Sequence, residues 1–457
     1  MGNKLEENKM GTMPMGKLLL SMSWPAVISM VIQACYNVVD TYFVSMTGEK
    51  ALTAITLIFP IQMLQIAVGV GTAIGVNSLI ARRLGARRYE DADRAASEGI
   101  KLSVINWLVF VVIGVFFAKP FVAAFTTDGD IIHQGATYLI IISVGCLFVM
   151  IQISCEKILQ ATGNMVMPML TNIIGAVTNI ILDPVLIFGF GPFPKMGIAG
   201  AAVATVIGQA IAMSVVVIIL FRKQEIITIN LHERFDKETL KDIYVVGGPS
   251  IIMQAIASIL NVGMNGILSG FSPTAVAVLG VYGRLQSFVF MPVFGISQGA
   301  TPVLGYNYGA RDKARLMKGF WVALVMAAVV MGLGLVVFQA IPDKLLSIFN
   351  ASDTMIKMGV PAFKAISVCF LPAAFGITCG CLFGATGHGF ISLFGSLLRQ
   401  MVGILPLAFF FSRLGELDLV WWAYPIAEII GTVYFLVTVR RLYTKEISKL
   451  DGISKEQ

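Results

Sequence analysis

Long apolar stretches recur along the whole chain of 457 residues and limit what it can fold into. Each is long enough to cross a hydrocarbon core of about 30 Å, which takes about 20 helical residues. We place twelve of them, at 17–44, 51–80, 100–124, 132–158, 166–190, 197–221, 244–269, 275–304, 317–341, 356–386, 390–412 and 417–439. An open sheet edge in lipid would leave backbone groups without hydrogen bonds. The predicted fold class is therefore an all-α integral membrane protein with twelve transmembrane helices.

The composition excludes several classes of protein. Charged residues make up 13% of the chain, about half of the roughly 25% that is usual in soluble domains. This excludes a cytosolic enzyme, a nucleic-acid binder and a secreted disulfide scaffold. All six Cys lie inside apolar runs, where they behave as small apolar residues, and there is neither a CxxC pair nor a His cluster. We expect no cofactor, no zinc site and no enzymatic activity, since no nucleophile and base are paired.

The basic residues predict the orientation in the membrane. Twelve spans place both termini on one side, and the tails and loops of that side carry 23 Lys or Arg, against six on the other side. Cytoplasmic loops carry the excess of basic residues, so both termini should be cytoplasmic, in the inner (plasma) membrane. The start of the chain shows no small-residue cleavage pattern, so residues 1–16 are expected to be a cytoplasmic tail and not a signal peptide.

The second half of the chain repeats the first at an offset of 224 residues. Pro25 matches Pro249, and the run Gly-Ala-Arg at 85–87 recurs at 309–311. Six spans per half give parallel repeats related by a pseudo-two-fold axis along the membrane normal, as in many transporters, with a substrate cavity expected between them. The predicted parts are an N-lobe, a cytoplasmic linker, a C-lobe and a C-terminal tail, at 17–221, 222–243, 244–440 and 441–457.

Acidic residues inside the spans are the first candidates for a functional site, because a charge in mid-membrane is costly. There are four, namely Asp40, Glu156, Asp183 and Glu428. Two of them have other polar side chains close by on the same helix, at spacings that place several of these on one face. Asp40 follows Gln33, Tyr36 and Asn37, and Asp183 follows Asn172 and Asn179, with Thr205 on the next span. These oxygen ligands suit a hard monovalent cation.

The repeat places this chemistry in the first lobe only. Met264 matches Asp40, and Leu407 matches Asp183. Polar side chains also join transmembrane helices by hydrogen bonds, which is the simpler interpretation of Asn172. Two buried carboxylates, in contrast, are unfavourable unless a proton or cation accompanies them.

Two arginines lie with Glu428 at mid-membrane depth in the second lobe, and a proline interrupts the first helix. Arg284, Arg399 and Glu428 have similar depths, so we expect a structural charge pair between Glu428 and one arginine. Glu156 lies at a helix end, where snorkelling would suffice. Pro25 removes a helical hydrogen bond from the helix of Asp40, which makes it a candidate hinge.

Taken together, these residues resemble a known family, the multidrug and toxic compound extrusion (MATE) transporters, in the bacterial DinF-like branch. The likeness covers nearly the whole chain. It lies in LGARRYEDA at 84–92, TGN at 162–164 and, most specifically, NIILDPVLIFGFGPFPKMGIAGAAVATVIGQ at 179–209. The resemblance implies export of cationic or amphiphilic drugs in exchange for Na⁺ or H⁺. By motif, it maps a first-lobe cation site onto Asp40, Asn179, Asp183 and Thr205, whereas the second-lobe acids of a NorM-like branch have no evident match.

The sequence thus favours a monomeric secondary antiporter whose partners are small-molecule drugs and membrane lipids. The alternative is a flippase of lipid-linked oligosaccharides or cell-wall precursors. Such proteins need cationic cavity residues for a pyrophosphate headgroup, and Arg284 and Arg399 are the only mid-membrane candidates. A channel or receptor is disfavoured by the tandem repeat. The choice between Na⁺ and H⁺ stays open.

Overall fold

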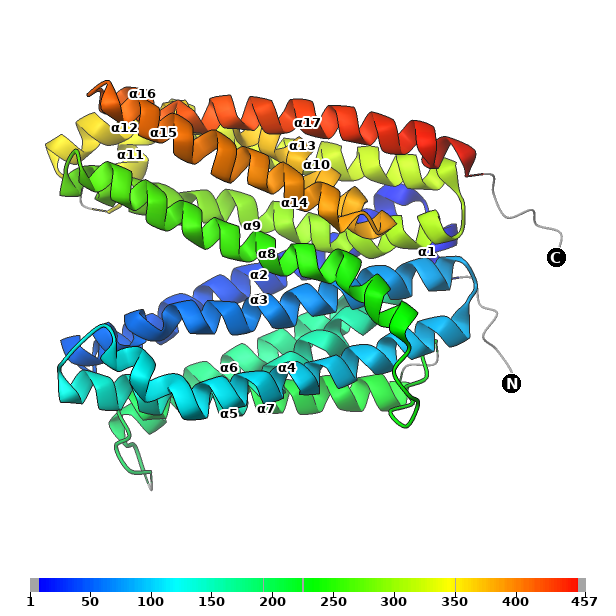
Figure 1. The fold of residues 1–457 in the computed structure, drawn as a ribbon, viewed down its shortest axis with the longest axis horizontal. Helices are drawn as coiled ribbons and strands as arrows, with labels where there is room; N and C mark the ends of the chain where they lie inside the picture. The colour runs from blue at the N-terminus through cyan, green and yellow to red at the C-terminus, as the bar shows by residue number, and fades with distance from the viewer. Residues whose placement is uncertain (1–7, 192, 224–225, 350, 451–457) are drawn as a thin grey trace. The chain divides into compact units, whose positions relative to one another are not determined.

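The computed structural model describes residues 8–450 except 192, 224–225 and 350 (Figure 1). Its described part is almost entirely helical and contains no strand. In the first repeat the helices are α1 (Lys9–Thr12), α2 (Met15–Ser45), α3 (Glu49–Gly85), α4 (Tyr89–Ala123), α5 (Gly129–Ala161), α6 (Val166–Phe188) and α7 (Ile198–Lys223). In the second they are α8 (Lys237–Ser269), α9 (Pro273–Gly309), α10 (Lys313–Ala340), α11 (Pro342–Ser347), α12 (Asp353–Ser367), α13 (Phe370–Thr386), α14 (Gly389–Leu397), the π-helix η1 (Leu398–Ile404), α15 (Leu405–Arg413), α16 (Leu417–Trp421), α17 (Ala423–Lys445) and the 3₁₀ turn η2 (Ile447–Lys449).

The helices confirm the predicted membrane-spanning architecture. Among the described residues, eleven helices are long and apolar enough to span a membrane, and α12 with α13 gives a twelfth span that is bent by 46°. Pro372 lies in the first turn of α13 and has no N–H to donate to the preceding turn, which explains a break at this point. Large apolar side chains such as Phe116, Val262 and Leu333 are exposed, as expected for surfaces that face lipid.

The repeat is visible in the backbone of two corresponding loops. Arg87, between α3 and α4, and Arg311, between α9 and α10, both have a φ of 58°, which is uncommon for a residue other than glycine. The N–H of Arg88 donates to the carbonyl of Arg83 at 2.9 Å, and the equivalent bond from Asp312 to Asn307 is 3.0 Å. The Gly-Ala-Arg run therefore encodes the same turn twice.

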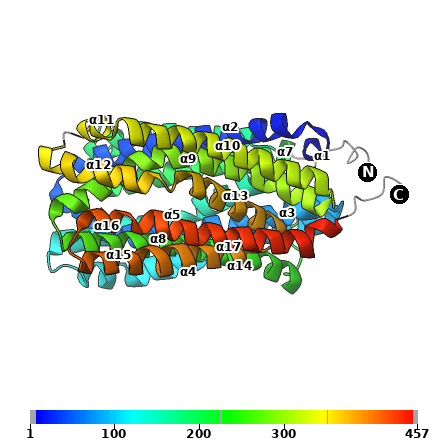
Figure 2. The same cartoon turned by 90° about the horizontal axis from the view of Figure 1, so that it is seen from above.

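The chain forms two compact units that differ from the predicted lobes at the first helix of each repeat. Unit 1 consists mainly of Ile28–Ile251, and unit 2 combines Lys9–Val27 with the residues from Ile252 onwards. Within unit 1, α5 contacts α3, α4 and α7 (Figure 1). Within unit 2, α9, α10 and α13 pack against one another (Figure 2). Helices α2 and α8 each contribute to both units, and the division in each follows a proline, Pro25 or Pro249, by two or three residues.

Paired glycines explain why the start of each first helix packs where it does. In unit 1, an added Cβ on Gly71 would lie 2.9 Å from the backbone nitrogen of Ile251, and one on Gly75 would collide with the carbonyl of Ile243, both in α8. In unit 2, the repeat-equivalent Gly295 and Gly299 make the same close approach to α2, where their Cβ atoms would lie 2.8 Å from backbone atoms of Val27 and Met22. Small residues four apart allow such backbone contact between membrane helices.

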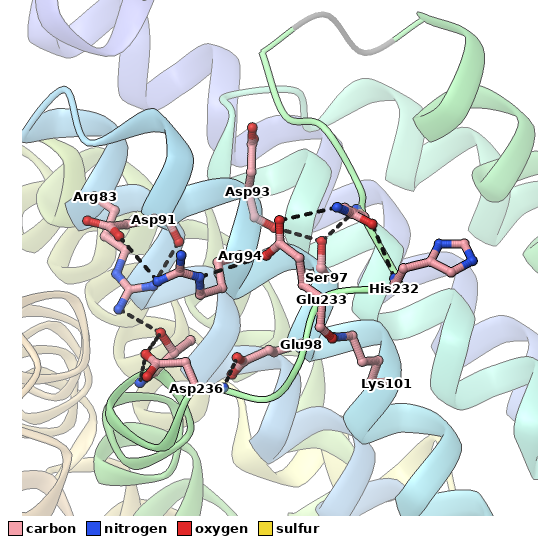
Figure 3. A network of polar contacts seen from close by, with 12 residues as sticks. Arg83, Asp91, Asp93, Arg94, Ser97, Glu98, Lys101, His232, Glu233 and Asp236 are labelled. Carbon is pink, nitrogen blue, oxygen red and sulfur yellow. Dashed lines mark hydrogen bonds and ion pairs between the residues drawn. The ribbon is translucent and has the colours of Figure 1, made fainter.

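Residues 228–236, just before α8, are bound to α4 rather than solvated throughout, as Figure 3 shows. The backbone N–H groups of Thr228, Asn230 and Asp236 donate to side chains of α4, namely Asp93 Oδ1 at 2.8 Å, Ser97 Oγ at 2.9 Å and Glu98 Oε1 at 2.7 Å. Lys101 Nζ donates to the carbonyl of Glu233 at 2.6 Å and lies over the ring of Phe235.

Residue Asp236 also caps α8. Its Oδ2 accepts from the N–H and the hydroxyl of Thr239, and these hydrogen bonds lower the pKa of the carboxyl. Arg83, on α3, donates to the hydroxyl of Thr239 at 3.0 Å (Figure 3). The entry into α8 is therefore held by α3 and α4.

Replacing Glu98 by alanine should release this segment locally. The side chain of Glu98 is fully buried, and its loss leaves the Asp236 N–H without its acceptor, at a cost of about 1–3 kcal/mol. A cost of about 1.4 kcal/mol corresponds to a tenfold increase in local opening. Trypsin cleavage of the purified protein after Arg234 should therefore accelerate about tenfold or more. Glu90→Ala, at an exposed position of the same helix, is the control, and equal cleavage rates in both variants would contradict the account.

Candidate ion-coupling site

Two carboxyl groups of unit 1 face each other inside the helices. Asp40 comes from α2 and Asp183 from α6, and their carboxyls lie within hydrogen-bonding reach of each other. Asp183 is fully buried and Asp40 is half-buried. Because ionised carboxylates only accept hydrogen bonds, a bond between them requires one proton. This pair therefore has a place for at least one positive charge.

An amide and a hydroxyl extend the pair toward α7. In the orientation that gives its partners complementary roles, the Asn179 amide donates to Asp183 Oδ2 at 2.8 Å. Its oxygen then accepts from the hydroxyl of Thr205 at 3.2 Å and from the Thr205 N–H at 3.0 Å. Asn179 and Thr205 are both buried. The four residues mapped from the family resemblance thus form one contiguous cluster.

Aromatic hydroxyls line the same cluster. Tyr36, one turn before Asp40 on α2, lies close to the side chain of Thr205. Tyr138 on α5 lies near Asp40 and Tyr36 and close to Gln62 on α3. Neither Tyr138 nor Gln62 is acidic, so the charge pattern of the spans does not predict them. Gln62 recurs as Gln286 in the repeat, and this was the one available signal for it.

Two oxygens of the cluster have no protein partner. Among the described residues, Oδ1 of Asp40 and Oδ1 of Asp183 are buried and accept no hydrogen bond. A buried carboxylate oxygen without a partner is costly unless a proton or cation satisfies it. The described residues contain no group of three or more His, Cys, Asp or Glu that would suit a multivalent metal. Carboxylate, amide and hydroxyl oxygens at one point suit a proton or a hard monovalent cation.

Three of the predicted neighbours form side-chain hydrogen bonds to residues outside this cluster. Gln33 and Asn37 are exposed, and the Gln33 amide donates to Asn37 Oδ1 at 3.3 Å. They share the face of Asp40 but bond to each other. Placing Asn172 at the site was wrong, because its amide donates to Glu156 Oε2 at 3.2 Å. Seven residues separate Asn172 from Asn179, about 10 Å along the helix axis.

Snorkelling does not describe Glu156, which is buried in its own polar cluster. Its Oε1 accepts from Gln152 at 2.9 Å and from the hydroxyl of Thr171 at 3.1 Å. With the bond from Asn172, three neutral side chains satisfy this carboxyl between α5 and α6. The hydrogen bonds give Glu156 a structural role.

In unit 2 the predicted charge pair of Glu428 is present, and its partner is Arg399. The guanidinium Nη1 of Arg399, in η1, lies 3.2 Å from both carboxyl oxygens of Glu428, in α17. Glu428 is buried. Arg284 is not part of this pair and lies instead on a pocket between α8 and α9.

Removing one partner of the unit 2 pair should be strongly destabilising. Arg399→Leu would leave the buried Glu428 carboxylate without its counter-charge, which costs about 3–5 kcal/mol, whereas Arg399→Leu with Glu428→Leu should be much closer to the unmodified protein. The measurement is the thermal unfolding of the detergent-purified proteins. A single variant as stable as the double variant would show that Glu428 can be left unpaired at no cost, contrary to this prediction.

Comparisons with known proteins agree with this architecture. A family model described as MatE matches residues 25–185 and 249–410. These ranges begin at the two prolines of the repeat and together cover more than half of the chain.

Individual relatives match along nearly their whole length. The multidrug export protein MepA of Staphylococcus saprophyticus is 27% identical over 93% of this chain and 93% of its own. An FAD transporter of Shewanella oneidensis is 26% identical, covering 91% of this chain and 92% of its own.

Solved structures match equally well. The outward-facing conformation of a multidrug resistance MATE family transporter has a TM-score of 0.89 at 26% identity, over 97% of this chain and 98% of that one. A MOP superfamily transporter from Pyrococcus furiosus, described with a binding pocket of reverse polarity, has a TM-score of 0.88 at 26% identity over the same shares.

Proposed function

Because the chain belongs to the MatE family of membrane transporters, we propose that it exports cationic or amphiphilic drugs by antiport with Na⁺ or H⁺. As a member of this family it is a transporter and not an enzyme. The names of its MepA relatives support drug export, and the Asp40–Asp183 cluster supports ion coupling. The observation that carries the proposal is the pair of buried carboxylate oxygens without a protein partner.

The proposed coupling is an exchange of charge at this cluster. When the Asp40–Asp183 pair already shares one proton, a further proton or Na⁺ that enters from outside neutralises it, and the neutral pair favours the conformation that releases drug. Release of the ion to the cytoplasm returns the negative charge to the pair and restores the other conformation. The ion shifts this equilibrium only by the difference in its affinity for the two states. Asn179 and Thr205 orient the Asp183 carboxyl throughout.

Helix α2 is the proposed moving part. Pro25 lies fifteen residues before Asp40 in the same helix, about 22 Å along the axis, and lacks the N–H that would close the helix there. The helix passes from unit 2 to unit 1 within three residues of Pro25. Neutralising Asp40 would change how the second part of α2 packs, with the bend at Pro25.

We further propose that the protein acts as a monomer in the inner (plasma) membrane with both termini in the cytoplasm. The excess of Lys and Arg on the side of the tails supports this orientation. Reporter proteins fused to the C-terminus test the orientation. A reporter that is active only in the cytoplasm should be active, and one that is active only outside the membrane should not.

The flippase alternative has less support. Of the two arginines it would need for a pyrophosphate, Arg399 is neutralised by Glu428, which leaves Arg284. A single arginine is a weak site for a group with several charges.

Whole cells that overproduce the protein test the proposal. We expect them to lose a cationic dye faster than control cells, and an imposed inward gradient of either Na⁺ or H⁺ should increase the rate. Dye efflux that ignores both gradients would argue against antiport, and the absence of any dye efflux would argue against drug export.

A further inference from the structure

A polar pocket in unit 2 is not used by the proposed coupling. It has a volume of about 340 Å³ and lies between α8 and α9. Its lining residues are Asn261, Asn265, Leu279, Gly280, Gly283, Arg284 and Ser287. This volume falls in the range of small-molecule sites, which are about 300–1,000 Å³. The pocket holds one charged side chain, Arg284, and no acid.

The charge of Arg284 is not balanced by the protein. Among the described residues no carboxylate forms an ion pair with it, and the acid within the spans of unit 2, Glu428, is bound to Arg399 at 3.2 Å. Asn265 also has no hydrogen-bond partner in the described part of the chain. By contrast, Asn261 and Ser287 donate to carbonyls of their own helices, at 3.1 and 2.8 Å. The guanidinium and the Asn265 amide therefore retain free donors toward the pocket.

Position along the helix places this arginine at membrane depth. Arg284 lies eleven residues into α9, about 16 Å from its start, whereas the hydrocarbon core is about 30 Å thick. An ionisable side chain at such a depth marks a substrate or ion pathway by default. The first repeat has Pro60 at the equivalent position, so this positive charge is confined to unit 2, as the Asp40–Asp183 pair is confined to unit 1.

We propose that this pocket binds an anionic oxygen group, a carboxylate or a phosphate, of the compound that is exported. A guanidinium presents a planar fork of donors that matches such groups bidentately. The amide of Asn265 would add a third donor. The inference rests on the proposed function and names a substrate class within it, namely amphiphiles that carry an anionic group on an apolar or aromatic body.

Matched substrate pairs test the pocket in proteoliposomes that contain the full-length protein. One pair is a rhodamine with a free carboxylate and its methyl ester, and the other is FMN and riboflavin, which differ by a single phosphate, so the two pairs test carboxylate and phosphate recognition separately. The variants are Arg284→Gln and Arg284→Lys. The control is Arg413→Gln, which removes a positive charge of the same unit that lies over the ring of Phe409.

The expected result is a loss that depends on the anionic group. Arg284→Gln should lower kcat/KM by about tenfold or more for the anionic member of at least one pair, as expected for a lost charge-assisted hydrogen bond, and leave the neutralised member unchanged. Arg284→Lys should recover part of the loss, and Arg413→Gln should show none.

Two results distinguish failure of this inference from failure of the proposed function. Equal losses for both members of each pair, or no loss for any member, would overturn the anion pocket while leaving drug export intact. No transport of any of the four compounds by the unmodified protein would overturn both.

Discussion

Replacing Asp40 by asparagine is expected to abolish the stimulation of drug export by an ion gradient while leaving the protein folded and inserted. Asparagine has nearly the same shape but cannot bind or release a proton and supplies one fewer charged oxygen. The ion gradient would then no longer shift the conformational equilibrium. Typical coupling free energies correspond to factors of about 5–150, and the stimulated rate should fall by a factor in this range. Asp183→Asn should have the same effect, because both carboxyls belong to one site.

The measurement is dye efflux with and without an imposed Na⁺ or H⁺ gradient, on variants whose yield and thermal stability match the unmodified protein. Asp130→Asn is the control. This exposed acid of unit 1 pairs with Lys50 at 2.7 Å, and its replacement should change neither coupling nor stability. Full ion-stimulated export by Asp40→Asn would refute the assignment of the site.

The second large effect is expected at Gly75, where a side chain should prevent unit 1 from forming. The Cβ of any replacement would collide with the carbonyl of Ile243, and backbone cannot move aside as a flexible side chain can. Overpacking usually costs about 1–3 kcal/mol, and Gly75→Leu should lie at or above the top of this range. We expect a low yield of folded protein and a lowered Tm in detergent.

A matched glycine of the partner helix controls for the substitution itself. Gly248 in α8 has open space around its Cβ position, so Gly248→Leu should be tolerated far better than Gly75→Leu. The repeat-equivalent Gly299→Ala should be destabilising, since its Cβ would lie 2.8 Å from the backbone of Met22. A Gly75→Leu variant with unchanged Tm would show that α3 and α8 do not approach as closely as described.

The helical spans and the two repeats could be predicted from the sequence, because each follows from a strong physical constraint. Apolar runs of membrane length leave the helix as the available structure, and the offset of 224 residues gave the two repeats. The division of α2 and α8 between the two units could not be found in this way. In both helices apolar residues lie on all sides of the axis, so periodicity does not show which neighbour each part contacts. The equivalence of Gly71 with Gly295 was visible, but the close approach it permits was not.

In the candidate site, too, the residues that are energetically costly in a membrane could be predicted, whereas the common polar and aromatic residues could not. Asp40 and Asp183 stood out because buried carboxylates are rare in membranes, and the structure brings them together with Asn179 and Thr205. Asn172 was misplaced because a shared helical face does not fix depth. Tyr138 could not be distinguished from other aromatic residues of the spans. Similar depth also could not decide between Arg284 and Arg399 as the partner of Glu428.

In the proposed antiport, drug and ion move in opposite directions through the same cycle. The direct test uses proteoliposomes of the purified protein, loaded with a Na⁺- or pH-sensitive dye, to which an outward gradient of a cationic drug is applied without any ion gradient. We predict that outward drug movement drives Na⁺ or H⁺ inward in the unmodified protein and that neither Asp40→Asn nor Asp183→Asn shows this ion movement. Drug export by the unmodified protein with no accompanying Na⁺ or H⁺ movement would contradict the account.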